Sequence, residues 1–370
     1  MKILQLVTRR QYRGAEVFAA NLSAELLKLG HSIYFVGLYK NHENVLSVRG
    51  AVNKDLVEVK NGPLSVGLIK QIVKLIGEVR PDVIQCNGSD TLKYMVAASF
   101  FLPKTPILYR NISMISEWVS SGPKKLVYKR LFKRISHVSS VGEEAIADFI
   151  KTFDYPKART SVIRRGIPLK DIERQEAAGN LKNELDLDGE AVIAMHVGNF
   201  SPEKNHAFLI EVFASLKTDH PHIKLVCVGS GMLLEETQRL VAEKALNNNV
   251  FFLGFRKNIS ELLAGADFFV LSSTVEGVPG VILEAATQKI PAIATNVGGV
   301  REVLEDHKTG FIVDGFDQSE FKNRILQLAK DNVLRSEMGS NAYHQVVENF
   351  NPVRNARKFE ELYTTLIQNQ

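Results

Sequence analysis

Two successive series of strand-like and helix-like segments constrain the fold of this chain more than any other feature. In the first series, short runs rich in Val and Ile predict the strands Ile3–Val7, Ile33–Leu38, Asp55–Val59, Val83–Gln85, Ile107–Tyr109, Val138–Val141 and Ser161–Ile163. Between them, apolar residues recur at helical spacing in Ala15–Leu29, Leu68–Val79, Leu92–Phe101 and Glu143–Phe153. Such alternation predicts a mainly parallel sheet that helices cover on both faces.

The same alternation begins again near residue 190. The second series predicts the strands Val192–Val197, Lys224–Val228, Val250–Leu253, Phe268–Leu271, Ala292–Thr295 and Phe311–Val313. It predicts the helices His206–Leu216, Leu233–Ala245, Ser260–Leu263, Gly280–Thr287, Val300–Leu304 and Glu320–Ala329. The chain has 370 residues, which is more than one hydrophobic core usually fills. We therefore expect two doubly wound, Rossmann-like α/β domains.

The domain boundaries follow from these series. We expect a first domain at residues 1–170, a second at 171–350, and a last helix within 351–370 that packs back toward the first domain. The segment Pro168–Asp188 is polar and lacks a helical or strand period, so it is the expected linker. Parallel sheets bind ligands at the carboxyl ends of their strands. Two such domains predict a cleft with one ligand on each wall, and closure of the cleft would exclude water.

Charge is unevenly distributed along the chain. Residues 1–170 contain 27 Lys and Arg against 13 Asp and Glu, whereas residues 171–370 contain 19 against 28. A basic first half suits a phosphorylated substrate, an anionic membrane or nucleic acid. No recognised nucleic-acid-binding module occurs, so nucleic acid is not the expected partner.

Cysteine usage and hydropathy indicate where the protein acts. Cys86 and Cys227 lie far apart within apolar runs and predict neither a disulfide framework nor a metal cluster. No apolar run approaches the roughly 18 residues of a spanning helix, and the N-terminus predicts a strand rather than a secretory signal. We expect a cytoplasmic protein, with peripheral association at the cytoplasmic face of the plasma (inner) membrane as an open alternative.

The most informative motif is Glu276-Gly277-Val278-Pro279-Gly280-Val281-Ile282-Leu283-Glu284. It follows a predicted strand and leads into a predicted helix, whose free backbone N–H groups favour an anion or a hydroxyl-rich group. Glu276 precedes the helix, and Glu284 lies about one turn inside it. Two carboxylates placed this way suit a sugar and a ribose. A strand–turn–helix with one solvated Glu remains the structural alternative.

Two further loops follow predicted strands. In His196-Val197-Gly198-Asn199-Phe200-Ser201-Pro202-Glu203-Lys204, Lys204 could neutralise a diphosphate and Asn199 could donate a hydrogen bond, although a lone lysine is more often a surface residue. Arg13-Gly14-Ala15-Glu16 opens a helix after the first strand but lacks the G-x-G-x-x-G spacing of a dinucleotide site. The chain also contains no G-x-x-x-x-G-K-[ST] motif. An NAD-dependent oxidoreductase and a P-loop nucleotidase are therefore disfavoured.

The order of these motifs resembles that of the retaining, nucleotide-sugar-dependent glycosyltransferases with the GT-B fold, glycosyltransferase family 4 (glycosyl transferases group 1). The resemblance covers the second half densely and the first half thinly. Its matching pieces are Arg13–Glu16, Val197–Lys204, Leu225–Gly231, Val250–Phe255, Ala266–Ser273, Glu276–Glu284 and Pro291–Glu302.

The resemblance implies a role for each matching residue. Glu276 would contact the donor sugar and support its anomeric carbon, and Glu284 would hold the ribose. Lys204 and Asn199 would bind the diphosphate. Gly14 would let the first-domain loop close over the donor phosphates, and the backbone at Gly277, Val278, Pro279, Gly280 and Val281 would hold donor groups. No metal and no cofactor are expected, since the nucleotide-sugar is a substrate and basic residues with helix ends can carry the phosphate charge.

Two positions depart from the family pattern. Asn199 stands where the family often has Arg, and Arg110 follows the strand Ile107–Tyr109 where the family often has His. We expect Arg110 to supply charge to the donor phosphates or to contact the sugar, and we count it with Glu276 and Lys204 as a catalytic candidate. Arg164 and Arg165 could bring further positive charge into the cleft.

A basic stretch in the first half predicts a further partner. Six cations, Lys124, Lys125, Lys129, Arg130, Lys133 and Arg134, alternate with apolar residues at helical spacing. Such a helix can lie on an anionic membrane, or it can pack on the core and solvate its basic face.

We therefore expect a glycosyltransferase that moves a sugar from a nucleotide-sugar donor, UDP- or GDP-linked, to a glycan or polyprenyl-linked acceptor in cell-surface polysaccharide, lipopolysaccharide or capsule synthesis. By resemblance the reaction retains anomeric configuration, through front-face displacement rather than double displacement at Glu276. Two alternatives stay open: a catalytically silent sugar-nucleotide-binding or scaffold protein, and a sugar-nucleotide epimerase.

Overall fold

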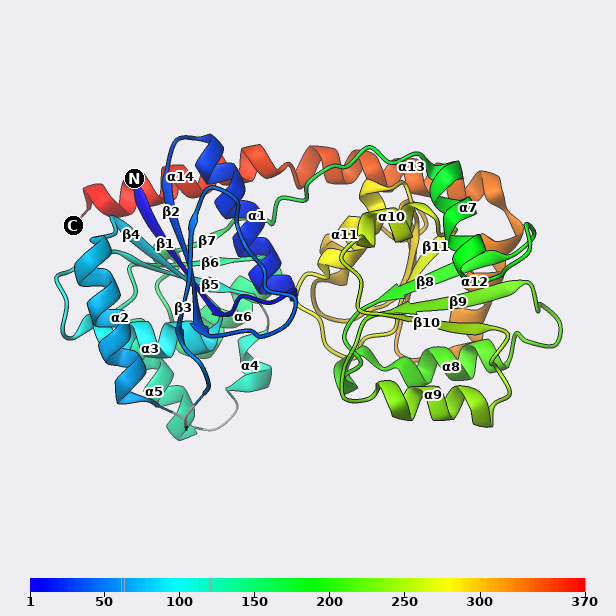
Figure 1. Ribbon diagram of the computed structural model, residues 1–370, viewed down its shortest axis with the longest axis horizontal. Coiled ribbons are helices and arrows are strands. Elements are labelled where there is room, and N and C mark those ends of the chain that lie inside the picture. Colours follow the sequence, from blue (N-terminus) through cyan, green and yellow to red (C-terminus); the bar gives the residue numbers. More distant parts are fainter. Residues whose placement is uncertain (61, 63, 113, 120–121, 370) are drawn as a thin grey trace. The chain divides into compact units, whose positions relative to one another are not determined.

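A computed structural model describes residues 1–60, 62, 64–112, 114–119 and 122–369. The chain forms two compact units (Figure 1). The first unit contains Met1–Pro168 and Phe350–Gln370, and the second contains Leu169–Asn349. The chain thus returns to the first unit for its last helix.

The first unit is built on a parallel sheet whose strands lie in the order β3-β2-β1-β4-β5-β6-β7. These strands are β1 (Lys2–Arg9), β2 (Ser32–Tyr39), β3 (Val52–Val57), β4 (Val83–Asn87), β5 (Ile107–Asn111), β6 (His137–Ser140) and β7 (Thr160–Val162). Its helices are α1 (Gly14–Lys28), α2 (Val66–Val79), α3 (Ser89–Ser99), α4 (Ile115–Trp118), α5 (Gly122–Phe132), α6 (Glu143–Phe153), the 3₁₀ turn η1 (Lys157–Arg159) and α14 (Pro352–Gln368).

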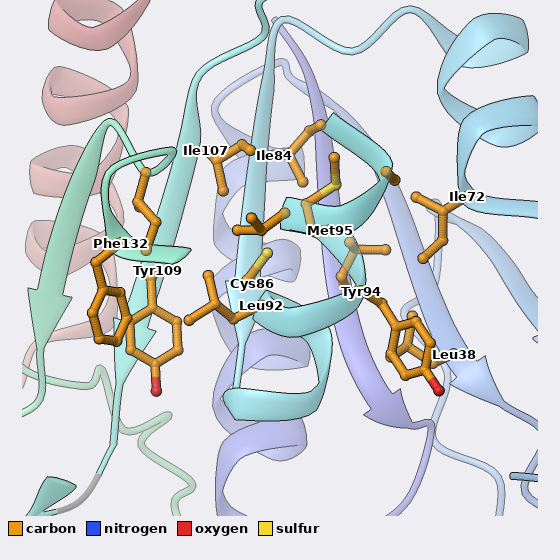
Figure 2. Packing of buried hydrophobic residues seen from close by; sticks show 14 of the residues in the cluster. Leu38, Ile72, Ile84, Cys86, Leu92, Tyr94, Met95, Ile107, Tyr109 and Phe132 are labelled. Atoms are coloured by element: carbon orange, nitrogen blue, oxygen red, sulfur yellow. The ribbon is translucent and has the colours of Figure 1, made fainter. Parts of the chain in front are cut away.

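Alternation along the strands separates two apolar layers of this unit. Leu4 and Ile84, which pair in register, face α2 and α3, whereas their neighbours Ile3 and Val83 face α1 and α14. Figure 2 shows Leu92 and Met95 of α3 against Ile84 and Cys86 of β4. Both faces of the sheet are therefore covered, as the continuous Val and Ile runs predicted.

The second unit repeats this architecture. Its strands lie in the order β10-β9-β8-β11-β12-β13, and the recorded pairs are parallel. They are β8 (Val192–Val197), β9 (Ile223–Val228), β10 (Val250–Gly254), β11 (Phe268–Leu271), β12 (Ala292–Thr295) and β13 (Gly310–Val313). Its helices are α7 (Arg174–Glu184), η2 (Pro202–Lys204), α8 (His206–Ala214), α9 (Leu234–Glu243), α10 (Ile259–Ala264), α11 (Gly280–Thr287), η3 (Gly298–Glu302), α12 (Gln318–Lys330) and α13 (Asn332–Asn349).

Three segments of this unit differ from the expectations. The chain passes from the first unit to the second at Pro168–Leu169, at the start of the predicted linker. The linker is shorter than predicted, because Arg174–Glu184 forms α7, which packs on α10 with Leu181 as its one buried side chain among the described residues of the helix. Gly265 permits this close approach, since a Cβ there would lie 2.7 Å from the Ala177 carbonyl oxygen. Because α7 buries one apolar side chain among its described residues and packs through Gly265 of another segment, its own sequence shows no helical period of apolar residues. The helix expected at Val300–Leu304 is instead the short 3₁₀ segment η3, and the long helix α13 was not predicted.

The structure contradicts the catalytic role that we expected of Arg110. The strand β5 extends to Asn111, so Arg110 is a strand residue and points to the same face as Leu108. Its guanidinium is fully buried, with its carbon 3.8 Å from the Phe18 ring centre and 5.2 Å from that of Phe359, and Nη2 donates to the Ile163 carbonyl oxygen. Desolvation lowers the pKa of Arg110 to about 9. Arg110 therefore helps to hold α1 and α14 on the sheet and does not face a ligand.

In the described part of the chain, no helix has both the length and the apolar composition needed to cross a membrane.

We predict that Phe359→Ala destabilises the first unit, because Phe359 is fully buried beside Phe18 and Arg110. The expected loss of unfolding free energy is about 3–5 kcal/mol, the usual cost of truncating a buried aromatic side chain. Urea denaturation followed by circular dichroism measures it. Lys358→Ala, at the exposed neighbouring position of α14, is the control and should change stability little; equal effects of the two variants would contradict this packing.

Candidate active site

The second sheet reverses its strand order between β8 and β11. Parallel sheets of this kind bind ligands where the order reverses, outside the carboxyl ends of the two strands. The loop after β8 carries Lys204, and the loop after β11 carries Glu276. The topology therefore brings two expected functional residues, 72 positions apart in sequence, to one edge of the sheet.

Lys204 and Glu276 form an ion pair at this edge. The Lys204 Nζ lies 2.6 Å from Glu276 Oε1, and the two side chains are 20% and 11% exposed. Ser273 is fully buried, and its Oγ donates to the same carboxylate oxygen at 2.7 Å. Charge-assisted hydrogen bonds of this length fix the carboxylate of Glu276 firmly. The pair retains enough exposure for a ligand to reach both charges.

Hydrogen bonds to backbone carbonyl groups join the loops that carry the pair. The Ser272 Oγ lies 3.0 Å from the carbonyl oxygens of Lys204 and Asn205, and donates toward them. The backbone N–H of Thr274 donates to the carbonyl oxygen of Glu203 at 2.8 Å. Thr295 Oγ1 donates to the Ser273 carbonyl oxygen at 2.7 Å. Neither loop depends on the ion pair alone for its position.

A glycine allows the Glu276 loop to pack on the next loop. Gly298 has a φ of +49°, and a Cβ there would lie 1.9 Å from the Glu276 carbonyl oxygen. The neighbouring Gly299 N–H donates to the Gly277 carbonyl oxygen at 2.7 Å. The segment Asn296–Gly299, which lies within the matching range Pro291–Glu302, thus supports the backbone of Glu276.

Two buried histidines lie beside Lys204. Their ring centres are 4.6 Å apart, and the His206 ring also stacks on Phe200. His196 Nδ1 lies 2.9 Å from the Val270 carbonyl oxygen, so Nδ1 carries the proton in the neutral ring. Burial, with the charge of Lys204 as a further cause, lowers the pKa of His206 to about 4 and moves that of His196 well below its ordinary value. The histidines are neutral at pH 7 and leave Lys204 as the cation of this group.

The remaining expected donor-binding residues occupy the same edge of the second unit. Pro279 is the N-cap residue of α11, and Gly280 is its first helical residue. The Ile282 N–H donates to the Pro279 carbonyl oxygen at 3.2 Å, whereas the N–H groups of Gly280 and Val281 precede the regular hydrogen bonds of the helix. Glu284 lies in the second turn and is half-buried, and Asn199 is exposed in the loop after β8. The positions Gly277, Val278 and Val281 are also half-buried around the start of α11.

Gly14 belongs to the first unit. It is the first residue of α1, and a Cβ built there would meet no atom within 4 Å. Its surroundings therefore do not require glycine in this conformation. In the described residues, no group of three or more His, Cys, Asp or Glu side chains could hold a metal ion.

The sequence prediction missed the residues that support the ion pair. Ser272 and Ser273 follow β11 directly, and polar residues at the carboxyl end of a buried strand were a usable signal. His196 lies inside β8 among apolar residues, and its relation to Lys204 depends on η2, a short 3₁₀ turn that ends with Asn205 at a φ of +49°. No sequence period reveals such a turn.

Comparison with known proteins shows the family. Residues 12–171 match "Glycosyltransferase Family 4", and residues 178–345 match "Glycosyl transferases group 1". A putative glycosyltransferase, EpsF of Bacillus subtilis, is 31% identical over 307 residues, covering 80% of this chain and 79% of that protein. The chain belongs to the GT-B glycosyltransferases of family 4 and is a glycosyltransferase.

Further relatives differ in coverage. The UDP-Gal:alpha-D-GlcNAc-diphosphoundecaprenol alpha-1,3-galactosyltransferase of Escherichia coli is 28% identical and covers 81% of this chain and 79% of its own length. The chain spans about half the length (49%) of the N-acetyl-alpha-D-glucosaminyl L-malate synthase of Bacillus anthracis, at 31% identity over 51% of this chain. A crystal structure of Anabaena HepE with UDP-glucose has a TM-score of 0.85 at 23% identity, covering 99% of this chain and 100% of that one. The doubly wound GT-B fold is thus confirmed.

We predict that Gly298→Ala displaces the Glu276 loop and weakens binding of UDP-sugars or GDP-sugars, because the new Cβ would collide with the Glu276 carbonyl oxygen. Gly315→Ala is the matched control: Gly315 also has a positive φ (+63°), but a Cβ there would meet nothing within 4 Å. Both variants carry a backbone strain of about 1–2 kcal/mol. Calorimetric titration with the donor that binds the wild type should show a loss for Gly298→Ala alone. Equal losses in both variants would contradict the supporting role of Gly298.

Proposed function

We propose that the protein is a retaining, metal-independent transferase that moves a sugar from a UDP- or GDP-sugar to a glycan or polyprenyl-linked glycan in cell-surface polysaccharide synthesis. The observation that carries this proposal is the Lys204–Glu276 pair at the strand-order reversal of the second sheet. It places a cation and a carboxylate, each partly exposed, beside the N-terminus of α11. The Lys204 cation can neutralise a diphosphate, and the Glu276 carboxylate can accept hydrogen bonds from sugar hydroxyl groups.

Lys204 is the group that can stabilise the leaving nucleoside diphosphate. Glu276 neutralises the charge of Lys204 at an Nζ–Oε1 distance of 2.6 Å. When the donor binds, its β-phosphate takes the place of Glu276 as the partner of Lys204, and the freed carboxylate accepts hydrogen bonds from the sugar. Negative charge grows on the phosphate oxygen as the glycosidic bond breaks. Lys204 then lowers the barrier, because it binds the transition state more strongly than the ground state.

The transfer step proceeds on one face of the sugar. The acceptor hydroxyl oxygen forms a bond to the anomeric carbon while the bond from that carbon to the phosphate oxygen breaks. The electron pair leaves with the nucleoside diphosphate, and the hydroxyl proton passes to the departing phosphate oxygen. Retention follows because attack and departure share a face. Glu276, held by Ser273, supports the positive charge at the anomeric carbon.

The acceptor assignment draws on the relatives. The Escherichia coli relative is named for a diphosphoundecaprenol-linked acceptor and a UDP-galactose donor. A Campylobacter jejuni relative, 26% identical over 57% of this chain, is also named for a diphospho-undecaprenol acceptor. A polyprenyl-linked acceptor requires the enzyme to work at a membrane, and we propose the cytoplasmic face of the plasma (inner) membrane.

We predict that Glu276→Gln and Lys204→Ala each reduce transfer by at least about 100-fold, the usual cost of removing one group that stabilises transition-state charge. Release of nucleoside diphosphate in the presence of acceptor measures the rate. Circular dichroism should show unchanged secondary structure. Glu203→Gln, on the exposed side of the same loop as Lys204, is the control and should retain near-wild-type transfer. Near-wild-type turnover in both site variants would rule out this assignment.

We also predict that one class of nucleotide-sugar raises the melting temperature of the wild type and fails to raise that of Lys204→Ala. A ligand that binds only the folded state stabilises it by mass action. UDP-, GDP-, ADP- and dTDP-sugars, with the free nucleotides as controls, identify the base. A donor that binds without transfer or hydrolysis would favour the silent sugar-nucleotide-binding protein, and conversion of donor without acceptor would favour the epimerase. No shift with any donor would contradict the proposed site.

A further inference from the structure

Four polar side chains are buried at the centre of the first unit, on the face of the sheet that α14 covers. They are Gln5 of β1, Gln85 and Asn87 of β4, and Tyr363 of α14. Each is at most 2% exposed. Toward the amino ends of the same strands, this face carries the apolar residues Ile3 and Val83. Burying polar groups costs free energy unless they form hydrogen bonds, so each of the four needs a partner inside the core.

The four side chains are one another's partners, because they form a closed cycle of hydrogen bonds. The Tyr363 hydroxyl donates to Gln85 Oε1 at 2.5 Å, and Gln85 Nε2 donates to Asn87 Oδ1 at 2.8 Å. Asn87 Nδ2 donates to Gln5 Oε1 at 3.0 Å, and Gln5 Nε2 donates to the Tyr363 hydroxyl oxygen at 3.3 Å. Most side-chain hydrogen bonds in proteins go to the backbone or to water, so this cycle is unusual. We call it the Tyr363 network.

A backbone group fixes the direction of the cycle. Asn87 Nδ2 also donates to the Leu6 carbonyl oxygen at 3.1 Å, so the Asn87 amide nitrogen faces β1 and its oxygen faces Gln85. Burial raises the pKa of Tyr363, so its hydroxyl keeps the proton and remains a donor. Each hydrogen bond polarises the next, and a fully satisfied buried network specifies one arrangement. The Tyr363 network therefore favours a single position of α14 against β1 and β4.

The network lies where the strand order of the first sheet reverses. Strands β1 and β4 are neighbours there, with Gln5 and Gln85 in register. Open parallel sheets bind ligands at such a reversal, outside the carboxyl ends of the two strands. Asn87 is the last residue of β4, and the next residue is Gly88, with a φ of +113°. Asn87 thus connects the network to the loop at which we expect a ligand of the first unit.

Hydrogen bonds carry the position of this loop into α3. Gly88 is the N-cap residue of α3, and its carbonyl oxygen accepts from the Thr91 hydroxyl at 2.7 Å. The same carbonyl oxygen accepts from the Leu92 N–H at 3.2 Å. A displacement of Asn87 would move Gly88 and disturb both hydrogen bonds. The start of α3 therefore depends on the Tyr363 network.

We propose that Tyr363 is a positioning residue for the acceptor, and that the network holds Asn87 and the loop at Gly88 in the conformation that binds the acceptor. The inference rests on the proposed function for the identity of the ligand. The reversal of the second sheet carries the Lys204–Glu276 pair for the donor, which leaves the reversal of the first sheet for the other substrate. Apolar side chains would hold α14 on the sheet equally well. A polar cycle adds a fixed geometry at the end of β4.

Tyr363→Phe tests the inference, because it removes one hydroxyl and keeps the aromatic ring that packs on Phe359. We expect the KM for the acceptor to rise about tenfold, with kcat and the KM for the donor within about twofold of the wild type. The acceptor is a detergent-solubilised polyprenyl-diphosphate-linked N-acetylglucosamine, and the donor is the nucleotide-sugar that raises the melting temperature of the wild type. Tyr155→Phe is the matched control, because Tyr155 is buried in the same unit and its hydroxyl donates to the Ile135 carbonyl oxygen, just before β6.

Hydrogen exchange provides a measurement that needs no substrate. The Leu92 amide should exchange about tenfold faster in Tyr363→Phe than in the wild type, because the start of α3 opens more often. In Tyr155→Phe its exchange should match that of the wild type.

A double variant tests whether the cycle acts as a unit. Gln85→Met removes two hydrogen bonds of the cycle at nearly constant volume. The double variant Tyr363→Phe/Gln85→Met should raise the acceptor KM no more than about twofold beyond the more severe single variant. Multiplied effects of the two changes would contradict a network that acts as one unit.

Three further outcomes would overturn the inference while the wild type transfers sugar. They are an unchanged acceptor KM in Tyr363→Phe, an equal rise of the donor and acceptor KM in that variant, or the same rise of the acceptor KM in Tyr155→Phe. Failure of the proposed function gives a different result. The wild type would then transfer no sugar, which overturns the acceptor as the ligand, while exchange of the Leu92 amide would still separate Tyr363→Phe from Tyr155→Phe.

Discussion

The ion pair between Lys204 and Glu276 is the interaction around which the second unit is organised. Removing two charges from water is costly, and the attraction between them compensates only when further hydrogen bonds satisfy both groups. Here Ser273 supplies one such bond to Glu276. Neutral His196 and His206 add no competing charge beside Lys204. Ser273 donates to Glu276 independently of Lys204, so the carboxylate keeps one hydrogen bond that does not depend on the ion pair.

This arrangement requires parallel topology and close backbone packing together. The reversal between β8 and β11 brings the two loops to one edge, and Gly298 lets a third loop support them from the side of β12. Gly229 has the same function for the other loop, because a Cβ there would lie 1.9 Å from the Gly198 carbonyl oxygen. Glycines in this unit therefore set the separation of the loops, and the loops set the separation of the charges.

Sequence periodicity predicted the strands of both units and the loops that carry Lys204 and Glu276, because buried parallel strands leave continuous Val and Ile runs. It could not predict α7, whose packing depends on Leu181 and on Gly265, the residue that follows α10. It also misplaced Arg110. The predicted strand ended at Tyr109, whereas β5 continues to Asn111. Arg110 therefore lies inside the strand, and its side chain points to one face of the sheet because strand residues alternate. A charged residue near a strand end is ambiguous until the register is known.

The burial of Arg110 changes what the excess of Lys and Arg in residues 1–170 implies about the surface of the first unit. An excess of cations in sequence predicts a positive surface only if the cations are available, and several are not. Arg110 is buried between aromatic rings, and Arg10 binds Asp55 through two hydrogen bonds at 2.8 and 2.7 Å. The cations of α5 are exposed and have no acidic neighbour in sequence between residues 122 and 136. An excess of cations in the sequence therefore measures the positive surface of a folded unit only after the burial and the pairing of each cation are known.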